Sequence, residues 1–238
     1  EGSACDLPLA AGAGDTRRVL ERLIEGVDVV VQPAAGRRRK LLPADMDSTM
    51  ITVECIDELA DYAGVKAEVA EVTERAMRGE VRFEDALAER VALLKGLDEA
   101  LVGRCYEERV RMTPGAEPLV RTMKRQGAYC LLVSGGFSSF ADRVAAALGF
   151  DKAVSNSLSV EAGRLTGLVP APIVGAEAKR RALLDAAAER AVDLSDTLAV
   201  GGGANDIPMI EAAGLGVAYR GKPRPGGGVA NGLALAPP

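Results

Sequence analysis

Short apolar runs alternate with longer stretches of helical periodicity along most of the chain. Four of the apolar runs are typical of buried strands. They are KLLPA (40–44), YCLLV (129–133), TLAV (197–200) and GVAY (216–219). The helical patterns that separate them cover 113–127, 138–149, 176–191 and 204–214. Strands that alternate with helices predict an α/β fold with a largely parallel, Rossmann-like sheet and right-handed crossovers.

A second pattern interrupts this alternation over residues 54–112, where every segment has helical periodicity. Gly64, Gly79 and Gly96 divide this stretch in the manner of helix ends. We therefore expect four helices, inserted as one unit after the first strand. Farther along the chain, SNSLSVEAGRLTG (155–167) alternates around a glycine and predicts a hairpin.

These patterns predict how the chain is divided. Residues 38–53 and 113–223 form the α/β core, and residues 54–112 form a helical cap. Residues 1–37 contain one helix-like stretch and are interpreted as the remnant of a regulatory domain. Residues 224–238 are rich in glycine and proline, which predicts an unstructured tail.

The composition narrows the possible chemistry. Histidine is absent, which excludes His-based general bases, Ser-His and Cys-His nucleophiles and His-ligated zinc. The net charge of -5 argues against a nucleic-acid partner, and no apolar run reaches the length of a membrane span. The four cysteines are far apart in the sequence, which favours a reduced, cytoplasmic protein without a cysteine metal cluster.

Three of the predicted strands end in polar turns. Asp45 and Asp47 follow the first strand, Ser134 ends the second, and Asn205 and Asp206 follow the third. A lone D-x-D more often marks a turn or a helix start than a catalytic pair. In open parallel sheets, however, ligands bind beyond the carboxyl ends of the strands. The coincidence of three such turns therefore favours a functional role for Asp45 and Asp47.

A series of motifs carries a family resemblance. DMDST (45–49), SGG (134–136), a lysine on a later helix and GGGAND (201–206) stand in the order found in haloacid dehalogenase-like phosphatases. Over about residues 38–223 the chain resembles these enzymes, and among them the bacterial phosphoserine phosphatases. The resemblance implies their sheet core with an inserted helical cap. It also implies an Mg²⁺-dependent phosphatase that releases L-serine from O-phospho-L-serine in serine biosynthesis.

The resemblance assigns the reacting groups. Asp45 would be the nucleophile that forms an aspartyl-phosphate, which divides hydrolysis into two easier steps. Asp47 would protonate the leaving hydroxyl and then accept a proton from the attacking water. Ser134 and the Gly135 amide would bind the phosphate. Lys179 would neutralise the phosphate and the nucleophile together.

The resemblance also implies how the substrate is held. Glu54 would bind the ammonium group of the substrate and Arg90 its carboxylate, which arginine can grip bidentately. Met77 and Phe83 would form an apolar wall. Without the resemblance, exposed helix charges and core packing explain these four cap residues equally well.

The metal site is where the sequence departs from the family. The resemblance implies Asp45, Asp47 and Asp206 as Mg²⁺ ligands and Asn205 as a support of the same loop and of the phosphate. Gly202 stands where the family has a further ligand aspartate. Loss of an anionic oxygen should weaken binding of a hard cation. Mg²⁺ is therefore expected to bind less tightly than in the family.

Three interpretations stay open from the sequence. The first is the phosphoserine phosphatase described above. The second is a phosphatase of the same fold that acts on another small phosphomonoester. The third is a weakened or inactive member of the fold, which Gly202, Pro43 within the first strand and the atypical tail favour. Arg180, next to Lys179, could also be mistaken for the site lysine.

Overall fold

The computed structural model describes residues 5–9, 16, 19, 20, 22–24, 29–34, 36–220 and 232–235, the last group by its backbone alone. The helix-like stretch TRRVLERLIEG (16–26) is therefore described only in part, and most of the predicted tail lies outside the described residues. The elements are β1 (Leu41–Ala44), η1 (Met46–Met50), α2 (Cys55–Ala63), α3 (Lys66–Met77), α4 (Phe83–Leu93), α5 (Glu99–Arg109), α6 (Ala116–Arg125), β2 (Tyr129–Phe137), α7 (Ser138–Leu148), β3 (Lys152–Asn156), β4 (Val160–Glu161), β5 (Arg164–Leu165), α8 (Ala176–Glu189), η2 (Leu194–Asp196), β6 (Leu198–Gly201), η3 (Ala204–Asp206), α9 (Ile207–Ala212), β7 (Leu215–Tyr219) and β8 (Gly232–Leu235). None of the described helices is long and apolar enough to cross a membrane.

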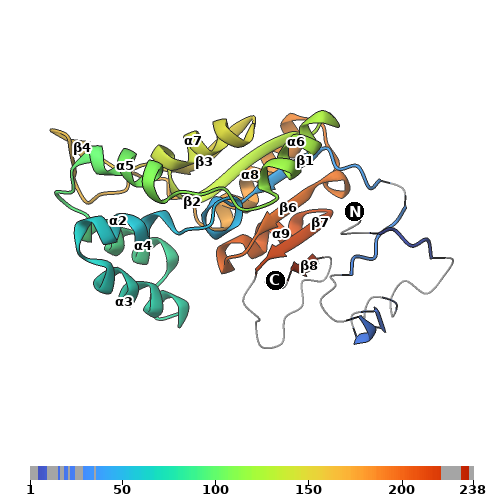
Figure 1. Cartoon of the computed structure of the whole chain (residues 1–238), viewed down its shortest axis with the longest axis horizontal. Coiled ribbons are helices and arrows are strands. Elements are labelled where there is room, and N and C mark those ends of the chain that lie inside the picture. Colours follow the sequence, from blue (N-terminus) through green and yellow to red (C-terminus); the bar gives the residue numbers. More distant parts are fainter. Residues whose placement is uncertain are drawn as a thin grey trace.

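A six-stranded parallel sheet in the order β3-β2-β1-β6-β7-β8 forms the core, which confirms the predicted α/β class (Figure 1). The sequence patterns missed β3 and assigned part of it to the hairpin. They also predicted no structure for the tail, and this is wrong at Gly232–Leu235, which forms β8 along β7. The edge of β7 offers unpaired backbone groups, and pairing with them orders a segment that has no local structural signal.

Alternation along the central strands builds two apolar layers. Leu42 and Cys130 belong to the larger core cluster, which includes buried residues of α6 and α7. A second cluster contains Leu41, which precedes Leu42 on β1, and Leu131, which follows Cys130 on β2. It also contains buried residues of α8 and α9. Because successive side chains of a strand point to opposite faces, these helix pairs cover opposite faces of the sheet.

The strand order places a site at one end of β1. The chain passes from β1 to β2 and β3 on one side, and then crosses to β6 on the other side of β1. Such a reversal opens a crevice beyond the carboxyl ends of the two strands that flank it, where open α/β sheets bind ligands. Here the flanking strands are β1 and β6, which lead to the DMDST and GGGAND segments.

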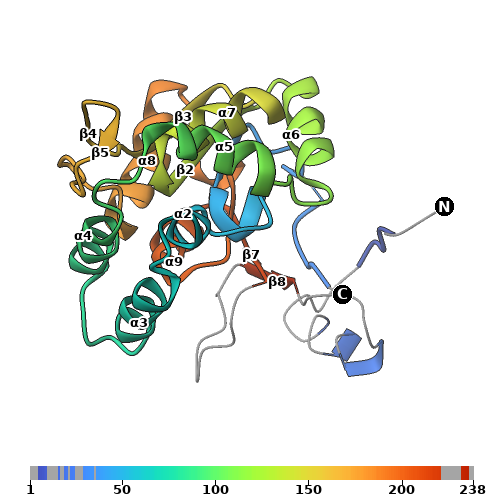
Figure 2. The same cartoon turned by 60° about the vertical axis from the view of Figure 1, so that its left-hand side comes forward.

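The four helices predicted over 54–112 are α2 to α5, and we call them the cap. Figures 1 and 2 show α2, α3 and α4 grouped at one end of the sheet. The predicted hairpin is β4-β5, and it holds the cap by backbone hydrogen bonds: Gly96 N–H donates to Leu165 O (2.8 Å), and Leu165 N–H donates to Leu97 O (2.9 Å). On α5, Glu107 pairs with Arg143 of α7.

Pro43 lies in the central strand despite having no N–H to donate. Its strand pairs with β2 at all four residues, but with β6 only at Ala44, opposite Val200. Asp45 N–H donates to Val200 O (2.9 Å), so the backbone nitrogen two residues earlier, that of Pro43, faces β6 as well. Proline is tolerated because it falls where the ladder is already interrupted.

Candidate active site

A tight turn after β1 positions the two aspartates of the D-x-D motif. Ile51 N–H donates to Met46 O (3.0 Å) and closes the turn η1, in which Met46 and Met50 point into the core. Ser48, which is not glycine, has a φ of +52° there. A left-handed residue of this kind costs on the order of 1–3 kcal/mol, and such residues cluster at functional sites. The turn carries Asp45 and Asp47 to the edge of the sheet.

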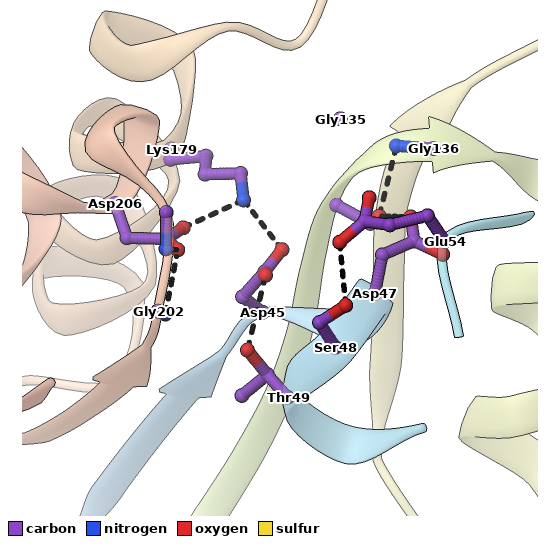
Figure 3. Close-up of polar contacts among 12 residues, drawn as sticks. Asp45, Asp47, Ser48, Thr49, Glu54, Gly135, Gly136, Lys179, Gly202 and Asp206 are labelled. Atoms are coloured by element: carbon purple, nitrogen blue, oxygen red, sulfur yellow. Dashed lines mark hydrogen bonds and ion pairs between the residues drawn. The ribbon is translucent and has the colours of Figure 1, made fainter. Parts of the chain in front are cut away.

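Lys179 links the ends of β1 and β6 (Figure 3). Its Nζ lies 2.5 Å from Asp45 Oδ1 and 2.6 Å from Asp206 Oδ1, and its side chain is 1% exposed. Burial lowers the pKa of Lys179, but the two carboxylates outweigh it and the pKa is raised. Burial and repulsion by Asp206 raise the pKa of Asp45, whereas Lys179 opposes both effects. One ammonium thus serves two buried carboxylates.

The same two contacts decide which basic residue belongs to the site. Lys179 is buried, whereas the side chain of Arg180 is 43% exposed and pairs with Glu177 one turn earlier on α8. The orientation of α8 therefore turns Lys179, and not Arg180, towards Asp45 and Asp206, and the role of Lys179 in catalysis stays a prediction.

Asp206 is committed on both oxygens. Oδ1 meets Lys179, and Oδ2 accepts the N–H groups of Gly202 (3.0 Å) and Gly203 (2.8 Å). The carboxylate is fully buried and organises the loop after β6. A Cβ at Gly201 would lie 2.5 Å from Asp206 Cγ, so the loop can close on Asp206 only with glycine at that position.

Asp47 faces the second strand end. Its Oδ1 accepts Cys55 N–H (3.1 Å), and its Oδ2 lies 3.4 Å from the Ser134 hydroxyl oxygen, which accepts Gly136 N–H (2.9 Å). Burial raises the pKa of Asp47 to about 6, with the Cys55 hydrogen bond opposing it. Its pKa near neutrality suits a group that first donates and then accepts a proton.

Glu54 approaches the site from the start of the cap. Ser48 Oγ donates to Glu54 Oε1 at 2.6 Å. The residue as a whole is exposed, but desolvation of its carboxyl group, followed by repulsion from Asp47, raises its pKa to about 7. The predicted ammonium ligand is thus brought next to the D-x-D turn.

Arg90 is half-buried on α4 and donates to backbone and hydroxyl oxygens, Ala86 O (3.2 Å) and Thr73 Oγ1 (3.4 Å). Burial lowers its pKa, and the carboxylates of Asp57 and Glu54 oppose that effect. Among the described residues no ion pair within 4.0 Å occupies Arg90, so its guanidinium keeps donors for an incoming carboxylate.

Phe83 and Asn205 both reach Gly135, from the cap and from the loop after β6. A Cβ at Gly135 would lie 2.9 Å from Phe83 Cζ and 3.5 Å from Asn205 Nδ2. The structure therefore brings these three predicted residues together. Met77, at the end of α3, is 62% exposed, and its place in an apolar wall stays a prediction.

The described residues do not assemble a three-carboxylate Mg²⁺ site, and no group of three or more acidic, cysteine or histidine side chains among them could hold a metal ion. Asp45 is engaged by Lys179 and by Thr49, and both oxygens of Asp206 accept hydrogen bonds from Lys179 and the loop amides. Gly202 offers no side chain. The geometry thus argues against Asp206 as the predicted metal ligand, since its donors hold it in the loop.

Two residues of the DMDST motif received no role from the sequence. Thr49 Oγ1 donates to Asp45 Oδ2 (3.2 Å), and Ser48 orients Glu54. The only sequence signal for these roles was that Ser48 and Thr49 directly follow the aspartates. A hydroxyl in such a position usually bonds to nearby backbone groups of the turn, so the signal was not specific. Only the fold of η1 directs each hydroxyl to a different carboxylate (Figure 3).

Comparison with known proteins identifies the family of this fold. The family model of the haloacid dehalogenase-like hydrolases matches residues 44–211. Phosphoserine phosphatases from Archaeoglobus fulgidus and Streptomyces coelicolor are 48% and 50% identical over 87% and 83% of this chain, which spans 60% and 48% of their lengths. The phosphoserine phosphatase of Polaromonas sp. is 48% identical over 78% of this chain and 80% of its own.

Solved structures show the same fold. A substrate-bound phosphoserine phosphatase complex has a TM-score of 0.74 and 40% identity, covering 79% of this chain and 89% of that one. A phospho-aspartyl intermediate analogue of phosphoserine phosphatase has a TM-score of 0.73 and 40% identity, covering 78% and 88%. The chain belongs to the haloacid dehalogenase-like hydrolase family and is a relative of the phosphoserine phosphatases.

Proposed function

We propose that this protein hydrolyses O-phospho-L-serine to L-serine and phosphate in the cytoplasm, by way of a phosphoryl group carried on Asp45. The observation that carries the proposal is the buried Asp45–Lys179–Asp206 cluster, which faces Asp47 and Ser134 at the switch point of the sheet. The name shared by the relatives supports the substrate.

The proposed chemistry assigns one task to each group. A phosphomonoester repels an anionic nucleophile, so catalysis depends on charge neutralisation and alignment. Lys179 supplies a positive charge next to Asp45, whose carboxylate attacks phosphorus. Asp47 gives its proton to the leaving serine oxygen, and it then takes a proton from the water that cleaves the aspartyl-phosphate. Ser134 and the Gly135 amide hold the phosphoryl oxygens.

The first test is release of inorganic phosphate from phosphoserine by the purified protein, with phosphoethanolamine and a simple alkyl phosphate as comparison substrates. Phosphoserine should be the preferred substrate. Preference for another small ester would favour the second interpretation. If the protein binds phosphoserine but turns over none of the esters, the third interpretation, an inactive member of the fold, is favoured. Gly202 supports that interpretation.

Arg90→Ala should raise KM for phosphoserine about 10- to 100-fold, because a hydrogen-bonded charge pair with the substrate carboxylate is lost. KM for phosphoethanolamine, which has no carboxylate, should change little. The matched control is Arg75→Ala, since Arg75 lies on the neighbouring cap helix and pairs with Glu89 at the surface. Equal losses on both substrates would make Arg90 structural.

Mg²⁺ dependence stays a prediction from the resemblance, and position 202 offers its test. Gly202 does not have a positive φ, but a Cβ there would lie 2.5 Å from Tyr219 O and 3.8 Å from Thr49 Oγ1. Gly202→Asp should therefore bring a carboxylate beside Thr49 at the cost of moving the end of β7. We expect about tenfold less Mg²⁺ at half-maximal activity and a lowered Tm.

Gly202→Ala is the matched control, because it creates the same contact with Tyr219 O and adds no carboxylate. It should lower Tm similarly without improving Mg²⁺ binding. Calorimetric titration of each variant with Mg²⁺ gives a readout independent of turnover. Unchanged Mg²⁺ affinity in the aspartate variant would show that position 202 does not lie at a metal site in this chain.

A further inference from the structure

The start of α4 contacts the core at two glycines. At Gly175, which precedes α8, an added Cβ would lie 2.8 Å from Glu84 Oε1 and 3.3 Å from Phe83 Cδ1. At Gly135 an added Cβ would lie 2.9 Å from Phe83 Cζ. The first two residues of this cap helix thus rest on two glycines of the core, one in β2 and one just before α8, where an added Cβ would displace the ends of their side chains.

The contact places a negative charge at an uncapped helix end. Gly175 is the N-cap residue of α8 and has no side chain to accept the first free N–H groups, and Lys179 N–H is the donor to Gly175 O (3.0 Å). Because the N-terminus of a helix carries a partial positive charge, the Glu84 carboxylate is stabilised there. Glu84 thus places a carboxylate beside Gly175, one turn before Lys179, where α8 has no capping side chain of its own.

The two ends of α4 are held in different ways. Beyond its last turn, Gly96 N–H bonds to Leu165 of the β4-β5 hairpin, which belongs to the core. At its first turn the contacts are the Phe83 ring and the Glu84 carboxylate, both against glycine. In Figure 2 the neighbouring helix α3 lies on the side of α4 away from the hairpin. The hairpin end is a fixed anchor, and the Phe83–Glu84 end can separate by losing only side-chain contacts.

We propose that Phe83 and Glu84 form a latch that holds the helical cap closed on the core, with Phe83 seated on Gly135 and the Glu84 carboxylate placed beside Gly175 at the N-terminus of α8. Glu84 and Gly175 are positioning residues, because they act through the cap and through the helix that carries Lys179. The inference deepens the proposed function, since it explains how the site is closed. The latch itself does not require turnover.

Hydrogen exchange measured by mass spectrometry, without substrate, tests the latch directly. Gly175→Ala and Glu84→Gln should each accelerate exchange in the peptide covering the first turns of α4 about threefold to tenfold. Gly103→Ala and Glu71→Gln are the matched controls. Gly103 has nothing within 4 Å of an added Cβ, and Glu71 is an exposed cap glutamate. Neither control should change exchange there.

A double substitution separates the latch from a local effect on α8. If Gly175→Ala acts by pushing Glu84 away, adding it to Glu84→Ala should cause little further acceleration, so the two effects are not additive. Full additivity, or acceleration confined to α8, would overturn the proposal. Unchanged exchange in both single variants would overturn it as well.

Kinetics then link the latch to the site. Glu84→Gln and Gly175→Ala should raise KM for phosphoserine more than they lower kcat, because closure precedes chemistry. If the protein turns over no phosphomonoester, the proposed function fails, while the exchange experiment still decides the latch. If turnover is present and the exchange is unchanged, only the latch fails.

Discussion

Asp45→Asn is expected to abolish phosphate release, by about 10³-fold or more, while the protein stays folded. An amide cannot attack phosphorus, and the chain has no histidine that could activate a substitute nucleophile. The fold should survive because Lys179 keeps Asp206 as a partner at 2.6 Å, so no buried charge is left alone. Circular dichroism and Tm measure folding, and a phosphate assay measures turnover.

The nucleophile itself is identified by trapping. Parent protein quenched with acid during turnover should yield a phosphorylated peptide that contains Asp45. Asp61→Asn, which changes an exposed aspartate paired with Arg109, is the control and should retain full activity. A label on Ser48 or Ser134 would contradict the assignment of Asp45.

Lys179→Met is expected to destabilise the fold as well as to abolish activity. The side chain is 1% exposed, and its loss leaves Asp45 and Asp206 buried without their shared cation. Removal of one partner from a buried ion pair costs about 3–5 kcal/mol. The measurement is the free energy of unfolding from urea titration at pH 7. Arg180→Met, next along the same helix and 43% exposed, should cost less than about 1 kcal/mol.

The loss of folding stability in Lys179→Met should depend on pH, and the direction of that dependence follows from the pKa of Asp45. Burial and the neighbouring Asp206 already raise the pKa of Asp45, and removal of Lys179 raises it further. A carboxyl group with a raised folded-state pKa stabilises the fold below its unfolded pKa of about 4, and that stability is lost as pH rises through the folded value. The stability gap between variant and parent should therefore narrow toward pH 4 and widen toward pH 7. A gap independent of pH would indicate lost packing.

Most of the core could be predicted from periodicity, because local pattern and tertiary environment agree there. Leu41 and Leu42 lie next to each other in a strand that is buried on both faces, and such strands read as continuous apolar runs. The four cap helices carry their own glycine boundaries. The sequence patterns failed for strands whose formation depends on their tertiary neighbours. Strand β3 is polar and half-buried, and β8 depends on the free edge of β7.

The sequence by itself determined which residue types are available to the site. It placed Asp45, Asp47 and Ser134 at strand ends and excluded histidine chemistry. The sequence also revealed Gly202, but not what a side chain at that position would meet. The obstacle in the structure is the carbonyl of Tyr219, which belongs to another strand.

Only the tertiary structure decided how those residues are paired. It turned Lys179 inward and Arg180 outward, and it directed Asp206 to a lysine and two amides. It also brought Glu84 to the N-terminus of α8. The contacts of Lys179 and of Glu84 join elements that are distant in the chain, and their geometry depends on helix orientation and on the parallel pairing of β1 with β6. Sequence spacing constrains only neighbours within an element, so it could not fix them.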